Sequence, residues 1–173
     1  MDIGKALLKE HSKKQSNRIV KYVGNDGKRF SELMRLFLHG DYRLTQRAAW
    51  PLSYIVIANP GLIKPYFKAL IDNFEKTKVP DAVIRNTVRI LQCIPIPKRF
   101  HGKVMKACFG FIQSNTTPAA IKAFSLTVLE KLAKIYPEIL RELQLIIEER
   151  WPIEKPAFRS RARKIMGRSV ILN

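Results

Sequence analysis

The sequence predicts an all-α fold, a solenoid of about four helical hairpins that follow an N-terminal helix. Apolar residues recur at helical spacing in nearly every segment, and nothing alternates with period two for long enough to predict a strand. Prolines and glycines separate these segments. Four basic residues then recur at separations of 38, 37 and 39 residues, a near-constant period typical of paired-helix repeats: Arg47, Arg85, Lys122 and Arg161.

Glycines and one acidic residue set the boundaries of the first three predicted helices. The N-terminal helix ends at Gly24 and is broken near Ser16, and the helix after it ends at Gly40. Asp41 follows at once, where its carboxylate is placed to cap the third helix. Pro51 lies inside this third helix, so we expect a kink or a local break there.

Prolines mark most later boundaries. Pro65 falls in the first turns of its helix, where a missing amide is tolerated, and Pro118 precedes another helix start. The Ile-Pro-Ile-Pro run over 94–97 is the sharpest break in the chain, because it cannot continue a helix. The helix after Pro118 has the clearest apolar stripe: Ile121, Phe124, Val128, Leu132 and Ile135. The predicted helices cover 1–24, 30–40, 42–58, 62–75, 81–94, 98–113, 119–136, 138–151 and 157–166.

Length and charge bound the organisation and the partners. At 173 residues we expect one domain over 1–173, with the N-terminal helix within 1–28 and a flexible tail over 167–173. The chain has 32 Lys and Arg against 14 Asp and Glu, a net charge of +18, of which residues 1–30 and 156–173 each supply +5. Such an excess favours polyanionic partners, with nucleic acid first and an anionic membrane surface or an acidic protein second.

Cysteine usage and hydropathy indicate the compartment. Cys93 and Cys108 are too few for a disulfide framework, which favours a reducing, intracellular setting. Lysines interrupt the N-terminus before any apolar run long enough for a signal peptide, and the nearly apolar stretch over 52–58 is too short to span a bilayer. We therefore expect a soluble, cytoplasmic protein.

The predicted hairpins resemble HEAT-type repeats, which are related to armadillo repeats. Asp41 and Arg47 carry this resemblance, because that family often has an aspartate in the turn between two helices and an arginine six residues later. Later units keep only part of the spacing, with Thr116 in place of the acid six residues before Lys122. Over about 28–167 the resemblance implies a right-handed α-solenoid and identifies no single function.

Eight basic residues are the candidates for binding nucleic acid. In one interpretation the four recurring residues are structural, and each forms hydrogen bonds with acids or carbonyls of adjoining repeats. This is the more expected role for Arg47. In the other, like charges four residues apart repel one another unless an anion lies nearby. The resemblance implies that second helices line the concave side, and arginine suits phosphate because its planar fork bonds two oxygens. The candidates are Arg43, Arg47, Arg85, Arg89, Lys122, Arg159, Arg161 and Arg163.

Three functions stay open. The first is a non-enzymatic HEAT-like module that binds a polyanion, nucleic acid above all, through a basic concave face. The second is an interaction scaffold whose groove accepts an acidic protein segment. The third resembles the alkylpurine DNA glycosylases, HEAT-like enzymes that use a carboxylate and tryptophans, with Asp41 and Trp50 in those roles, although core packing is the better explanation of Trp50. No catalytic motif occurs, no cofactor is predicted, and Cys93, His101 and Cys108 match no zinc spacing.

Overall fold

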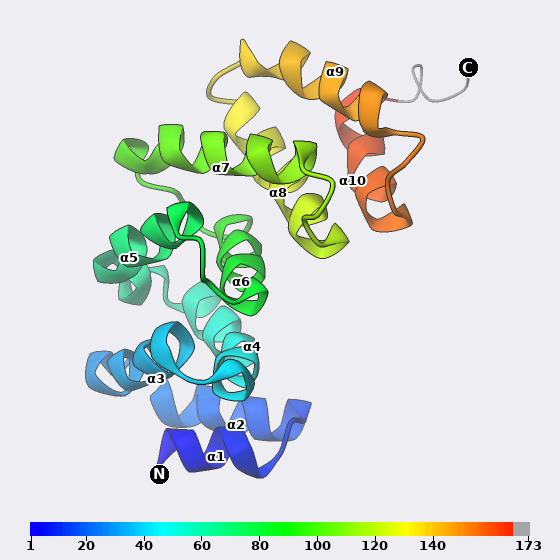
Figure 1. Cartoon of the computed structure of the whole chain (residues 1–173). Helices are drawn as coiled ribbons and strands as arrows, with labels where there is room; N and C mark the ends of the chain where they lie inside the picture. Colours follow the sequence, from blue (N-terminus) through cyan, green and yellow to red (C-terminus); the bar gives the residue numbers. More distant parts are fainter. Residues whose placement is uncertain (168–173) are drawn as a thin grey trace. The chain divides into compact units, whose positions relative to one another are not determined.

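The computed structural model describes residues 1–167, and over these residues the chain forms ten α-helices, three short 3-10 helices and no strand. This confirms the all-α prediction (Figure 1). The tail predicted over 167–173 lies outside the described residues, apart from Gly167. The α-helices are α1 (Ile3–Lys9), α2 (Lys13–Val23), α3 (Gly27–His39), α4 (Tyr42–Ala58), α5 (Phe67–Asp72), α6 (Asp81–Leu91), α7 (His101–Gln113), α8 (Ala119–Ala133), α9 (Ile139–Arg150) and α10 (Pro156–Met166).

The N-terminal segment forms two helices, and the break between them comes earlier than predicted. The chain leaves the helix at Glu10, and the hydroxyl of Ser12 accepts the amide of Gln15 at 3.1 Å to cap α2. A buried hydrogen bond then joins the two helices, since the Gln15 side chain donates to the carbonyl of Ala6 at 2.7 Å. The break therefore lies at a capping serine, and Ser16 is a buried residue inside α2.

Prolines act differently in two helices. Pro51 lies inside α4, yet that helix is continuous over Tyr42–Ala58, so no break forms there. The segment predicted as one helix over 62–75 is instead a 3-10 helix over Pro60–Tyr66, then α5, then a 3-10 turn over Asn73–Glu75. Pro65 cannot donate the amide of an α-helical turn, so the chain keeps the tighter 3-10 winding until it has passed that proline.

The apolar stripe predicted for the helix over 119–136 includes one residue, Ile135, that lies beyond the end of the helix. α8 ends at Ala133, so Ile135 falls beyond the helix and is 57% exposed instead of buried. Ile121, Val128 and Leu132 are buried as predicted. The helical spacing fails for Ile135 because it no longer applies once the helix has ended.

The chain divides into two compact units, which we call unit 1 (Met1–Ile94) and unit 2 (Pro95–Asn173). In unit 1, α4 is the central helix and packs against α1, α2, α3 and α6. Figure 1 shows α3 and α5 on one side of this unit and α4 and α6 on the other. Its core includes fully buried aromatic and aliphatic side chains: Phe30, Leu33, Phe37, Leu52 and Val56.

In unit 2, α8 is the central helix and packs against α7, α9 and α10. Its core holds Val104, Leu126, Leu129, Leu143 and Phe158, each buried. The chain passes from unit 1 to unit 2 within the Ile-Pro-Ile-Pro run, where a helix break is predicted. A single domain over 1–173 stays a prediction.

Candidate functional site

The eight candidate basic residues fall into two groups, one in each unit. Unit 1 holds four of them, Arg43 and Arg47 on α4 and Arg85 and Arg89 on α6. Unit 2 holds the others: Lys122 on α8, and Arg159, Arg161 and Arg163 on α10. Within unit 1, α4 and α6 pack against each other.

Arg47 has a structural contact. Its Nη1 donates to the carbonyl oxygens of Leu7 at 3.0 Å and Leu8 at 2.8 Å, in the last turn of α1. Carbonyls at the end of a helix lack intrahelical donors, and a positive charge is favourable there. The interpretation of Arg47 as a structural residue that donates to carbonyls of a neighbouring helix is confirmed, and the residue is half-buried.

Lys122 is enclosed in a buried cluster of three charged side chains. Its Nζ donates to Oε1 of Glu154, and the same oxygen accepts Arg150 Nε at 2.8 Å. Arg150 also donates to the carbonyl of Gln113 at 2.8 Å and to Oδ1 of Asn115 at 3.0 Å. All three charged residues of this cluster are buried. The structural interpretation is therefore confirmed for Lys122 as well.

The charge state of this cluster follows from its hydrogen bonds. Burial pushes the pKa of the Glu154 carboxyl up, but the hydrogen bonds and positive charges of Lys122 and Arg150 outweigh burial, so this pKa lies below its ordinary value. Glu154 is thus ionised near neutral pH and neutralises one of its two partners. The cluster lines a hollow of about 420 Å³ whose rim includes Thr117, Ile153 and Lys155.

The outward face of α4 combines arginine with aromatic side chains. Arg43, Arg47, Trp50, Tyr54 and Ile57 follow one another at spacings of four, three, four and three residues, which puts them on one face of the helix. The opposite face is buried and includes Ala48, Leu52, Ile55 and Val56. Tyr54 is 38% exposed and Ile57 is 50% exposed. We call this outward set the α4 row.

Trp50 differs from its sequence-based prediction. Core packing is predicted for it, but the side chain is only half-buried and meets the ring of His11 edge-on, with 5.7 Å between ring centroids. The reason is its position, because Ala48 and Ala49 take the buried face of α4 and Trp50 falls on the opposite side. Trp50 therefore belongs to the α4 row.

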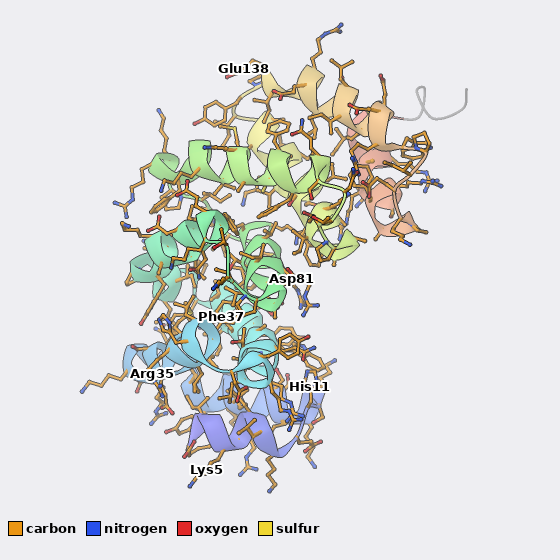
Figure 2. All side chains as sticks on the ribbon, viewed as in Figure 1. Lys5, His11, Arg35, Phe37, Asp81 and Glu138 are labelled. Carbon is orange, nitrogen blue, oxygen red and sulfur yellow. The ribbon has the colours of Figure 1, made fainter. Side chains whose placement is uncertain are left out.

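The outward face of α6 carries Arg85 and Arg89, one turn apart. Both are half-buried, and within residues 1–167 neither guanidinium has a hydrogen-bonding or ion-pairing partner. Figure 2 shows His11 and Asp81 on the side of unit 1 that carries α4 and α6, and Arg35 on the opposite side. Because α6 packs against α4, we group the α4 row with Arg85 and Arg89 and call this set the α4–α6 face.

Two of the three arginines of α10, Arg159 and Arg163, lie near the Trp151 ring. Arg159 donates to the carbonyls of Trp151 at 3.0 Å and Pro152 at 3.1 Å, and its guanidinium carbon lies 5.7 Å from the centroid of the Trp151 ring. Arg163 lies 5.5 Å from the same centroid and is exposed, whereas Arg161 is half-buried. The indole attracts both charges, so this like-charged pair has a stabilising partner within the chain.

Asp41 and His101, which the enzyme and zinc-site hypotheses would need, have structural hydrogen-bond partners. The carboxylate of Asp41 accepts the amide of Leu44 at 2.8 Å and so caps α4, as predicted. His101 contacts the carbonyl of Ile96 at 2.7 Å and the hydroxyl of Tyr136 at 3.0 Å. Burial raises the pKa of the Cys108 thiol to about 12. Across residues 1–167, no three His, Cys, Asp or Glu side chains gather as a metal site would require.

No helix of the part that the structure describes combines the length and the apolar character needed to cross a bilayer.

Sequence reasoning missed three residues that shape these surfaces. Arg150 and Glu154 are four residues apart, a spacing that indicates an ion pair, but Lys122 lies 32 residues before Glu154 and no local pattern joins them. Tyr54 was detectable, because it continues the helical spacing from Arg47 and Trp50.

The comparisons with known proteins agree with the helical architecture. A family model described as a HEAT repeat domain matches residues 3–169, nearly the whole chain. No curated protein and no solved structure matches the chain.

Proposed function

Because the chain belongs to the HEAT repeat domain family, whose members are helical-repeat scaffolds, we propose that it is a non-enzymatic binding module for a polyanion, nucleic acid above all, and that it binds through the α4–α6 face. Arg85 and Arg89 are the observation that carries this proposal. Two like charges one turn apart repel each other by a few tenths of a kcal/mol, about 0.2–0.5, unless an anion lies nearby. Within the described residues they have no acidic partner, so their charge is available to a ligand.

Arginine suits phosphate because its guanidinium stays charged and bonds two oxygens at once. Arg43 adds a further exposed charge on the adjacent helix. Lys122 is left out of this surface, since its ammonium is enclosed by Glu154. Contacts of this kind bind any phosphate backbone and weaken steeply as salt rises.

The proposal is tested by charge reversal. In the double variant Arg85→Glu/Arg89→Glu, we expect retention on heparin to fall and the affinity for a 20-nucleotide DNA oligonucleotide to drop by about tenfold or more, with the salt dependence of binding reduced by about two phosphate contacts. The matched control is Arg35→Glu/Lys64→Glu, which changes the net charge equally, with both residues exposed and outside this face. Equal loss in both variants, or no loss in either, would refute the assignment of the α4–α6 face.

A second candidate is a protein-interaction scaffold, because HEAT repeats typically mediate protein interactions. The exposed side chains of Tyr54 and Ile57, which are neighbours in the α4 row, favour it, since contiguous exposed apolar surfaces mark partner-binding sites. Binding of polyglutamate with the affinity of an oligonucleotide of equal charge would favour this scaffold. Release of a modified base from DNA would instead contradict the non-enzymatic part of the proposal.

The cytoplasm is the setting that we propose. Cys93 and Cys108 are both free thiols, and neither needs an oxidising compartment.

A further inference from the structure

We propose that the α4–α6 face takes single-stranded nucleic acid in preference to duplex, with Tyr54 stacking on a base while Arg85 and Arg89 contact phosphates. This inference rests on the proposed function and names the form of nucleic acid that the face accepts. Its evidence is the exposed side chain of Tyr54 on the helix that packs against the one carrying Arg85 and Arg89.

Tyr54 is the central observation. It lies on the outward face of α4, one turn after Trp50 and one turn before Ile57, and 38% of the side chain is exposed. Exposed apolar side chains that continue one another on a helix mark a surface with a partner. Arg43 and Arg47 precede Tyr54 in the α4 row, and α6, which packs against α4, carries Arg85 and Arg89.

The combination of rings and guanidinium groups selects the single strand. In a duplex the bases are paired and stacked inside, so a protein that meets the backbone finds phosphates and no free base face. In a single strand the bases are free to stack on aromatic rings while the backbone follows the positive charges. The arginines alone would fit either form of nucleic acid, whereas an unpaired base that can stack on Tyr54 is available only in the single strand.

The α4–α6 face also favours nucleic acid over an acidic peptide. Carboxylates would pair with the arginines but would leave the exposed tyrosine ring without a flat partner. Every nucleobase offers such a face, so stacking is tolerant of sequence.

Trp50 provides a direct readout, because the chain has only two tryptophans. In the full chain with Trp151→Phe, the remaining indole lies one turn from Tyr54. We expect a 20-mer of oligothymidylate to quench Trp50 fluorescence and to bind at least tenfold more tightly than a hairpin duplex with the same number of phosphates. Polyglutamate of equal charge serves as the protein-like probe.

Matched tyrosine variants isolate the stacking contact. Tyr54→Ala should weaken oligothymidylate binding about tenfold and leave duplex binding unchanged, while Tyr54→Phe should keep the full affinity. Tyr42→Ala is the control, because Tyr42 is 64% exposed on the same helix but lies outside the α4 row.

The outcomes separate this inference from the proposed function. Equal binding of strand and duplex that still depends on Arg85 and Arg89 would overturn the single-strand inference and leave the polyanion proposal standing. Equal losses for Tyr54→Ala and Tyr42→Ala would overturn it too. Binding of polyglutamate with neither nucleic acid bound would overturn both.

Discussion

The recurring basic position has different partners in the two units. In unit 1, Arg47 donates to two carbonyl oxygens at the end of α1 and stays half exposed. In unit 2, Lys122 is buried against a carboxylate that it shares with Arg150. The units have similar charge, with 17 Lys and Arg against eight acids in unit 1 and 15 against six in unit 2. Charge available to a ligand therefore depends on where the acids lie, and a net charge alone does not reveal it.

The largest expected effect comes from removing the acid that distinguishes unit 2. Glu154→Gln leaves Lys122 and Arg150 buried without a counter-charge, and we expect the free energy of unfolding to fall by about 3–5 kcal/mol. The measurement is urea denaturation followed by Trp151 fluorescence in a Trp50→Phe background. Glu149→Gln is the control, because Glu149 is an exposed residue of α9, the helix that also carries Arg150, and a loss within about 0.5 kcal/mol is expected there.

The same variant sharpens the comparison between the units. In the complementary background Trp151→Phe, Trp50 reports unit 1. A parallel shift of both signals would support a single cooperative domain over 1–173, whereas a shift of Trp151 alone would show that the units unfold separately. An unchanged midpoint of the Trp151 signal would contradict the stabilising role of the buried cluster.

A smaller effect is expected in unit 1. Arg47→Ala removes two hydrogen bonds from a charged donor that is only half-buried, so we expect a loss of about 1.5–2 kcal/mol and faster amide hydrogen exchange in α1. Arg43→Ala is the matched control, because Arg43 is exposed one turn earlier on the same helix. Comparable exchange rates of α1 in the two variants would show that the Arg47 contact contributes nothing.

The sequence determined the helices far better than it determined the role of each basic side chain. Helical spacing, Gly40, Asp41 and the proline-rich break at 94–97 predicted nearly every element, because those signals are local. The partners of Lys122 could not be predicted, since Glu154 lies in another hairpin and the pairing arises only from packing. Ile135 shows the same limit on a smaller scale, because a stripe predicts burial only while its helix lasts. The placement of the candidate ligand-binding arginines on one face stays a prediction.

The smallest expected effect is the dependence of unit 2 on pH. The pKa of Glu154 is lower in the folded chain than its ordinary value of 4.5, so its stabilisation is fully present above that value and is lost as pH falls through the folded pKa. Between pH 7 and pH 5 we therefore expect Glu154 to cause no change in the unfolding midpoint reported by Trp151. At lower pH the midpoint should decline, and this decline should be absent in Glu154→Gln. Glutamine, like a protonated carboxyl, keeps an oxygen acceptor and lacks the charge, so the decline should not exceed the loss caused by Glu154→Gln. Asp26 in unit 1 supplies the contrast, because the backbone hydrogen bond from Arg29 lowers the pKa of that exposed carboxyl as well. If Asp26→Asn, and not Glu154→Gln, removed the acid decline of the Trp151 signal, the buried cluster would not be its origin.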